Sequence, residues 1–186
     1  MLPELRQRYS YGQADLRNVQ DQSPLGYEYT AETISPSVCL VPILRSGLSM
    51  VDALQSLLPD PVSVHHLGMY REKTTLQPVE YYNNLPYHKA GDESSKVPEL
   101  AIIVDPIIAT GSTVCAAIDT LRDWGVPRIL SISVLASKGG LEKAAEAWTE
   151  GIELWVGGVD AETDEKGMIK PGLGDIGDRL FLTLGK

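Results

Sequence analysis

Asp105 and the loop of residues 109–113 contain the residue types needed to bind a phosphate group. The hydroxyl side chains of Thr110 and Thr113 lie on either side of Gly111, which permits close approach of a ligand. An apolar, β-branched run precedes Asp105, and apolar residues at helical spacing follow the loop. At such a strand-to-helix junction, backbone N–H groups lack intrahelical partners and the helix dipole favours negative charge. The loop therefore predicts a phosphate monoester site, although an ordinary capped turn has the same composition.

Two further loops could also do chemistry. Arg45 lies in a short loop with Gly47 after a second apolar strand, where it could contact a ligand or be a surface residue of a strand–helix connection. Residues 167–179 contain four Gly, one Pro and two Asp, which predicts a particular backbone path rather than a helix or a simple strand. Such a loop could offer main-chain N–H and C=O groups to a flat polar ligand, or could be a glycine-rich turn.

The elements that must position these loops alternate along the chain. Apolar runs predict strands at residues 38–43, 62–70, 99–104, 128–135 and 152–156, with a protruding ribbon at 78–87. Helical spacing follows three of them, at residues 48–58, 114–122 and 141–148. This alternation predicts an α/β fold with a doubly wound, mainly parallel sheet flanked by helices, in which ligands bind beyond the carboxyl ends of the strands.

The overall composition limits the classes of function. The 186 residues include 43% apolar and 22% charged residues, as expected for a globular domain, with no apolar run of transmembrane length. A formal charge of −9 argues against a general nucleic-acid-binding surface. Cys39 and Cys115 lack metal-ligand spacing, which favours buried, reduced thiols and a cytoplasmic protein. His65 and His66 are adjacent and would point to opposite faces of a strand, so they predict no shared site.

Residues 1–35 are polar and rich in turn residues, without sustained periodicity, which predicts an arm or partly ordered lead-in. We therefore expect an N-terminal arm at residues 1–37 and one domain at residues 38–186. Trp124, Trp148 and Trp155 lie at element ends or apolar positions and are expected to anchor the core.

Taken together, four segments resemble the signature segments of uracil phosphoribosyltransferases. They are residues 41–47 (VPILRSG), 68–71 (GMYR), 104–112 (VDPIIATGS) and 171–179 (PGLGDIGDR), and their order and spacing match from about residue 38 to the C-terminus. The resemblance implies a type I phosphoribosyltransferase fold with a protruding β-ribbon and a C-terminal hood over the base. It also implies transfer of 5-phosphoribose from phosphoribosyl pyrophosphate (PRPP) to uracil, giving UMP and pyrophosphate.

The same resemblance assigns roles to individual residues. The loop 109–113 would hold the 5-phosphate, Asp105 the ribose hydroxyls, and Arg45 and Arg71 the pyrophosphate. Catalytic roles fall to Arg45, Arg71, Asp105 and Asp175. PRPP contacts are implied for Arg45, Arg71, Asp105, Pro106, Ile107, Ile108, Ala109, Thr110, Gly111, Ser112, Thr113 and Asp175, and uracil contacts for Ile169, Gly174, Asp175 and Ile176. Mg²⁺ would arrive bound to PRPP rather than in a protein cage.

The chain departs from the family pattern at three places. The family has a longer N-terminal region with a helix before the first shared strand, so residues 1–37 are expected to be divergent or shortened. Ser112 stands where a second Gly is usual, and Met168 where Tyr is usual. The expected partners are PRPP and uracil, without nucleic acid or membrane, in a homodimer or higher homo-oligomer.

Other functions remain open from the sequence. A catalytically weak or silent regulator that binds PRPP or UMP would share the fold, although the four residues with implied catalytic roles are all present. An RNA-binding regulator would need clustered Lys or Arg. A purine phosphoribosyltransferase would not explain residues 171–179.

Overall fold

The computed structural model describes residues 16–34, 37–58, 60–72, 75, 77–86 and 97–183, and divides the chain into two compact units, Met1–Ser37 and Val38–Lys186. In the first unit, strands β1 (Leu16–Gln22) and β2 (Glu28–Ile34) form an antiparallel hairpin. Its turn is closed by backbone hydrogen bonds between Ser23 and both Gly26 and Tyr27, and Gly26 has a φ of 83°, which glycine adopts readily. The sequence predicted no regular element here, because polar residues occupy both faces of the strands.

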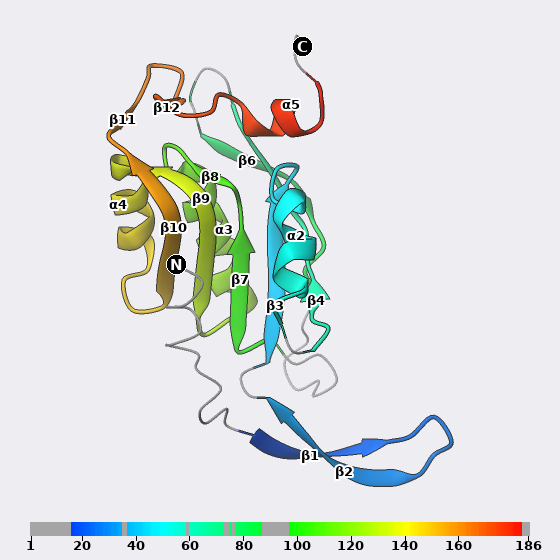
Figure 1. Ribbon diagram of the computed structural model, residues 1–186. Helices are drawn as coiled ribbons and strands as arrows, with labels where there is room; N and C mark the ends of the chain where they lie inside the picture. Colours follow the sequence, from blue (N-terminus) through cyan, green and yellow to red (C-terminus); the bar gives the residue numbers. More distant parts are fainter. Residues whose placement is uncertain are drawn as a thin grey trace. The chain divides into compact units, whose positions relative to one another are not determined.

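The second unit contains the expected α/β sheet, so the predicted fold class is confirmed (Figure 1). In spatial order the strands are β10 (Ile152–Asp160), β9 (Ile129–Ser137), β7 (Leu100–Val104), β3 (Val38–Leu44), β5 (Leu67–Arg71) and β6 (Pro78–Asn83). Neighbouring strands from β10 to β5 are parallel, and β6 is antiparallel to β5. Two short strands extend the sheet, because β4 (Ser63–Val64) pairs with β3 and β8 (Ile107–Ile108) with β9.

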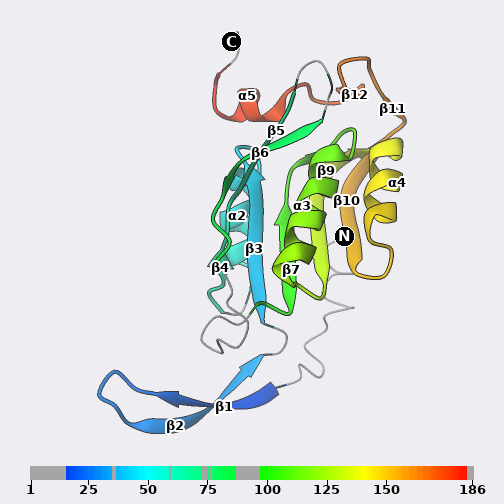
Figure 2. The ribbon, with the colours of Figure 1, turned by 180° about the vertical axis from the view of Figure 1, so that it is seen from behind.

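Helices cover both faces of this sheet (Figures 1 and 2). Helix α2 (Leu48–Gln55) packs against an apolar cluster that includes Leu40 and Val104, on one face. Helices α3 (Ser112–Trp124) and α4 (Lys138–Ala147) pack on the other face. None of the helices within the described ranges is long and apolar enough to cross a membrane.

The core consists mainly of the apolar strand residues that the sequence indicated. Cys39 is fully buried, and burial raises the pKa of its thiol to about 12, so it remains protonated. Cys115 is only half-buried, in contrast to the expectation, and both cysteines are free. His65 lies outside the strands, with its ring 5.3 Å from that of Trp124, and burial lowers its pKa. These features belong to packing rather than to a site.

The C-terminal segment lies at the carboxyl end of the sheet (Figure 1). It contains an antiparallel pair, β11 (Glu162–Thr163) with β12 (Ile169–Lys170), followed by helix α5 (Ile176–Leu180). The structure differs from the sequence predictions in three elements. Helix α2 ends at Gln55 rather than residue 58, the run 62–70 is two strands separated by the histidine pair, and the glycine-rich segment contains β12 and α5.

Candidate active site

The candidate site lies where the chain reverses its direction of progress across the sheet, between β3 and β7. Strand β3 pairs in parallel with β7, with Pro42 opposite Val104, so the loops after both strands emerge side by side. A Cβ at Gly47 would lie 2.3 Å from the carbonyl oxygen of Val104, so the first loop rests directly on the end of β7. In open α/β sheets this reversal is where ligands bind.

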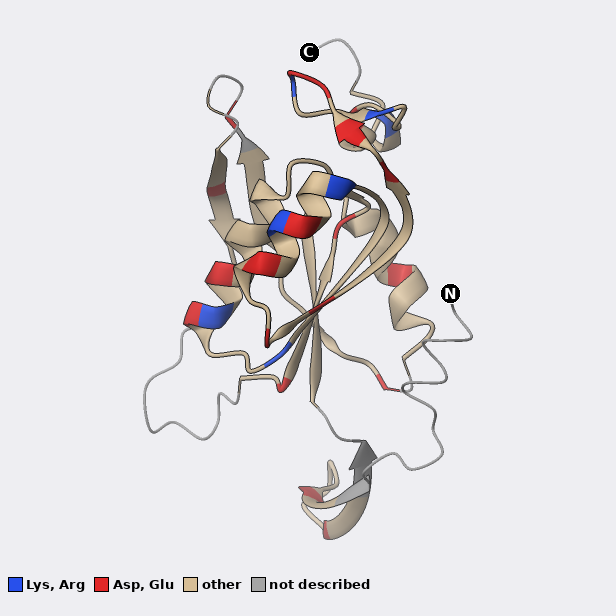
Figure 3. Cartoon of the chain, turned by 90° about the vertical axis from the view of Figure 1, so that its left-hand side faces the viewer, with Lys and Arg blue, Asp and Glu red and all other residues tan. Residues whose placement is uncertain are grey.

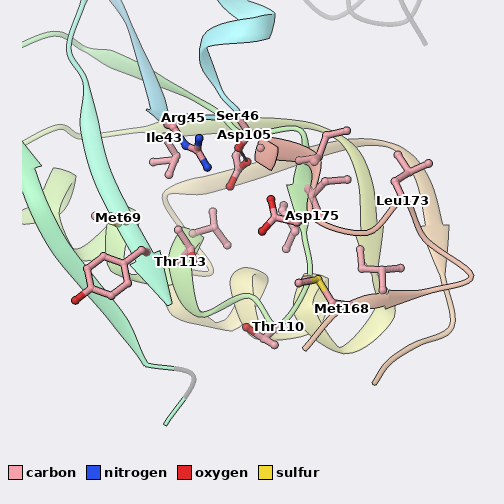
Figure 4. A pocket seen from close by; sticks show the side chains of 18 of the residues that line it. Ile43, Arg45, Ser46, Met69, Asp105, Thr110, Thr113, Met168, Leu173 and Asp175 are labelled. Carbon is pink, nitrogen blue, oxygen red and sulfur yellow. Dashed lines mark hydrogen bonds between the residues drawn. The ribbon is translucent and has the colours of Figure 1, made fainter. Parts of the chain in front are cut away.

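A cleft of about 710 Å³ opens at this point (Figure 4), within the size range of small-molecule sites. Its walls come from four parts of the second unit: the loop after β3, the β5–β6 ribbon, the segment from β7 to α3, and the C-terminal segment. The lining residues include Arg45, Ser46, Met69, Tyr70, Tyr81, Asp105, Thr110, Thr113, Glu165, Lys166, Met168, Ile169, Gly174 and Asp175. The sheet therefore brings together most of the residues that the sequence pattern singled out.

Asp105 lies at the base of the cleft with only 8% of its surface exposed. Its Oδ1 accepts a hydrogen bond of 3.0 Å from the hydroxyl of Ser46, in the neighbouring loop. Buried carboxylates are costly unless they are hydrogen-bonded, so this contact helps to fix the orientation of the side chain. Figure 4 shows Asp105 and Asp175 pointing into the cleft.

The loop 109–113 forms the turn into α3. Gly111 has a φ of 77°, and a Cβ there would lie 2.6 Å from the carbonyl oxygen of Gly140, so the turn requires glycine. Thr110 and Thr113 line the cleft at the amino end of this thirteen-residue helix. The arrangement has the hydroxyls, the close backbone approach and the helix dipole that favour a phosphate.

Arg45 lines the cleft but is not free within it. Its Nη2 forms a 2.8 Å ion pair with Oδ1 of Asp178, and its Nη1 donates to the hydroxyl of Thr183 at 3.2 Å. Its guanidinium also lies 5.8 Å from the centre of the Phe181 ring. Arg45 therefore connects the loop after β3 to the C-terminal segment, and an anion in the cleft would compete with Asp178 for it.

Short polar contacts hold the C-terminal segment in its path. Asp175 caps α5, since its Oδ1 accepts the N–H of Asp178 at 3.0 Å. Asp164 accepts the N–H groups of Lys166 and Met168, and the bond from Met168 is the main cause that lowers the pKa of its carboxyl. Arg179 donates to the carbonyl oxygen of Leu173 at 2.8 Å. These contacts position backbone groups around Gly174 without using a long regular element.

Not every sequence-predicted residue lines the cleft. Pro106 and Ser112 lie behind it: the carbonyl of Pro106 accepts two N–H groups of β9, and the Ser112 hydroxyl accepts a bond from Lys143. The backbone of Arg71 ends β5, but its side chain lies outside the described part of the chain, as do residues 87–96. The remaining predicted residues, Ile107, Ile108, Ala109 and Ile176 included, line the cleft.

The sequence pattern did not single out Ser46, Tyr81 and Glu165 as parts of the site. Ser46 could have been noticed because it lies between Arg45 and Gly47 in the same short loop. Tyr81 is on the ribbon, and only the antiparallel pairing of β5 with β6 brings it beside Tyr70, with ring centres 6.1 Å apart. Glu165 comes from the turn between β11 and β12, which no sequence pattern predicted.

The charged residues that line the cleft, among those described, are Arg45, Lys166, Asp105, Glu165 and Asp175. No group of three or more His, Cys, Asp or Glu side chains within the described ranges could hold a metal ion.

Comparisons with known proteins agree with this geometry. The family described as "Uracil phosphoribosyltransferase" matches residues 9–183. A putative uracil phosphoribosyltransferase of Schizosaccharomyces pombe is 46% identical over 170 residues, covering 90% of this chain and 78% of that protein. A uracil phosphoribosyltransferase of Roseiflexus castenholzii is 41% identical over 155 residues, covering 83% of this chain and 70% of the relative. The family match begins before Val38, so it includes part of the first unit that the motifs alone left out.

A solved structure also resembles the chain over most of its length. The AQ2163 protein from Aquifex aeolicus is 31% identical, with a TM-score of 0.71, and the match covers 92% of this chain and 79% of that one.

Proposed function

The chain belongs to the uracil phosphoribosyltransferase family, and from this membership we propose that its cleft transfers 5-phosphoribose from PRPP to uracil. The bond between C1′ and the pyrophosphate oxygen breaks, a bond from C1′ to N1 of uracil forms, and the N1 proton is released. The observation that carries the proposal is the convergence of Arg45, Asp105, the loop 109–113 and Asp175 on one cleft.

We assign the 5-phosphate to the loop 109–113. Backbone N–H groups at the start of α3 and the hydroxyls of Thr110 and Thr113 would donate to its oxygens. Asp105, held by Ser46, would accept hydrogen bonds from the ribose hydroxyls. Both contacts fix the sugar before reaction, and positioning of this kind supplies a large part of the rate in two-substrate reactions.

The charges that develop during the reaction suggest roles for the remaining residues of the cleft. As pyrophosphate leaves, positive charge grows on the ribose ring and negative charge grows on the leaving group. Asp105 and Asp175 line the cleft and would favour the first, and Arg45, which also lines it, would stabilise the second. Arg71 would join Arg45 in this role. To do so, Arg45 must exchange its ion pair with Asp178 for the pyrophosphate, which couples leaving-group binding to the C-terminal segment.

We further propose that backbone groups at Ile169 and residues 174–176 read the pyrimidine. Gly174 lines the cleft with a φ of 71°, which turns its backbone sharply at this position. Cytosine has an amino donor where uracil has a carbonyl acceptor, so a backbone N–H aimed at that atom would face another donor. Sites built on such hydrogen bonds reject near-isosteres strongly.

Mg²⁺ enters this scheme as the PRPP complex, with carboxylates of the cleft available as additional oxygen ligands. The tyrosine-bearing ribbon of β5 and β6 borders the cleft and is proposed to close over it when both substrates bind. The free thiols favour a cytoplasmic enzyme, and we propose a homodimer or higher homo-oligomer.

The test is to incubate the purified protein with PRPP, Mg²⁺ and one acceptor at a time, and to separate products by chromatography. We expect UMP from uracil, and little or no nucleotide from orotate, hypoxanthine, adenine or cytosine. Binding of PRPP and uracil without any product would contradict the enzyme and support the regulator that shares this fold.

A further inference from the structure

The amino end of α4 is joined to the loop 109–113 by contacts that have no assigned role in the proposed reaction. The hydroxyl of Ser137 donates to the carbonyl oxygen of Ala109 at 2.6 Å and accepts the N–H of Gly140 at 2.9 Å. A Cβ at Gly140 would lie 2.1 Å from that same carbonyl oxygen. The first turn of α4 is thus packed directly against the backbone of the loop.

One turn further along α4, Lys143 reaches the same loop. Its Nζ donates a 2.8 Å hydrogen bond to the hydroxyl of Ser112, the first residue of α3. Ser112 is 8% exposed, and its hydroxyl lies 3.4 Å from that of Thr110, which lines the cleft. The ammonium group of Lys143 is therefore bonded to Ser112, within the loop whose backbone N–H groups would face the phosphate.

The charges of the cleft indicate why the ammonium group of Lys143 would matter for an anionic substrate. Two cationic and three anionic side chains line the cleft in the described part of the chain, and Arg45 is already paired with Asp178. A substrate with a monophosphate and a pyrophosphate must nevertheless bind there. Figure 3 shows Lys and Arg scattered along the chain among Asp and Glu. Because the attraction between a cation and an anion falls with distance and is screened by salt, a cation close to the loop has more effect than distant ones.

We propose that Lys143 is a positioning residue for the 5-phosphate of PRPP and UMP, acting through Ser112. It fixes the Ser112 hydroxyl and the first turn of α3, and places a positive charge behind the phosphate. The inference rests on the proposed function, because it assumes that the loop 109–113 receives a phosphate. It predicts that Lys143 affects ligands that carry a 5-phosphate and leaves those without one unchanged.

The test compares Lys143→Met, Lys143→Arg and a control, Lys138→Met. Lys138 is on the same helix, but its Nζ faces the exposed carboxylate of Glu142 at 4.0 Å instead of the loop. Dissociation constants for ribose 5-phosphate, ribose, UMP and uridine are measured by calorimetry at low and high salt, together with the KM for PRPP and for uracil.

For Lys143→Met we expect the dissociation constants of ribose 5-phosphate and UMP, and the KM for PRPP, to rise roughly three- to tenfold at low salt. The values for ribose, uridine and uracil should not change. Lys143→Arg should retain most of the binding, and Lys138→Met should behave like the parent protein. In a Ser112→Gly background, the effect of Lys143→Met should shrink, because the group through which Lys143 acts has been removed.

Equal losses for ligands with and without the phosphate would overturn the inference and indicate a purely structural contact. Unchanged binding of ribose 5-phosphate would overturn it as well. Both results are independent of turnover, because they concern binding. A failure of UMP formation by the parent protein would instead count against the proposed function alone.

Discussion

At the scale of single residues, the account depends on Asp105 and on the loops that converge around it. Asp105 is buried, bonded to Ser46 and open to the cleft, which is the position expected for a group that holds a sugar hydroxyl. The sequence predicted correctly that Asp105 directly follows a buried strand, and its role as a ribose ligand stays a prediction. It could not predict Ser46 as its partner, because that contact depends on the pairing of β3 with β7.

Gly174 provides the sharpest test of how the base is read. Its φ of 71° costs an alanine roughly 1–2 kcal/mol, and a Cβ there would have no described protein atom within 4 Å. Gly174→Ala should therefore fold, yet raise the KM for uracil strongly while the KM for PRPP changes little. Steady-state kinetics with each substrate varied will measure this.

The matched control is Lys170→Ala, an exposed residue of the same segment, which should be nearly silent. Equal, small effects from the two substitutions would mean that residues 171–179 form only a structural turn. Gly172 is unsuitable for this purpose, because a Cβ there would lie 2.0 Å from the carbonyl oxygen of Ile169.

Arg71 ends β5, at the base of the ribbon that borders the cleft. Arg71→Ala should raise the KM for PRPP and lower kcat while leaving thermal unfolding unchanged. Loss of one charge-assisted contact to phosphate should cost about 1.5–3 kcal/mol of binding free energy. Unaltered PRPP kinetics in this variant would remove Arg71 from the site.

At the scale of elements, β9 contains a contrast that tests the energetics of the sheet. Ser131 is buried between Ile103 of β7 and Leu154 of β10, and its hydroxyl has no hydrogen-bond partner in the described part of the chain. Ser137, at the other end of the strand, is also buried but bonds two backbone groups. The same residue type thus has opposite energetic consequences at two positions of one strand.

Ser131→Ala should stabilise the fold, because it removes a buried, unsatisfied hydroxyl that costs about 1–3 kcal/mol. We expect the Tm in calorimetry to rise by roughly 2–4 °C for each kcal/mol gained. Ser137→Ala should lower the Tm and raise the KM for PRPP, since it frees the loop 109–113 from α4. A fall in Tm for Ser131→Ala would show that its hydroxyl is bonded in solution.

The buried strands could be predicted because burial on two faces gives continuous apolar runs, and α3 and α4 because burial of one face gives apolar residues at helical spacing. The hairpin β1–β2, the break at His65 and the short helix α5 could not. Polar side chains on both faces of β1 and β2 leave no alternation of apolar and polar residues that would indicate a strand. The five residues of α5 are too few to show helical periodicity. The sequence predicts ligand contacts for Asp175, and the structure shows that its side chain caps α5.

At the scale of the whole molecule, the comparisons place the chain in its family, and the sequence motifs had already predicted that family. The motifs did so because four segments, spread along the chain between residues 41 and 179, match the family pattern in order and spacing. The sequence could not predict the reach of Lys143 to Ser112, or the pairing of Arg45 with Asp178, since both depend on how helices pack on the sheet.

Several tyrosines of the ribbon, Tyr70, Tyr81 and Tyr82, are about half exposed. Apolar surface of this kind is often covered by a partner. We therefore expect sedimentation velocity to show a dimer or larger species, and a Tyr82→Glu substitution to shift it toward smaller species. A parent protein that sediments as a monomer at all concentrations would contradict this expectation.

The central claim is that one cleft transfers phosphoribose to uracil. Phosphorus NMR of the parent protein with Mg²⁺ and PRPP tests it directly, because PRPP, pyrophosphate and UMP give separate signals. We predict that UMP and pyrophosphate appear in equal amounts only after uracil is added, and that Asp105→Asn abolishes both. Pyrophosphate released without uracil, UMP formed equally well by Asp105→Asn, or PRPP that remains intact would contradict the account.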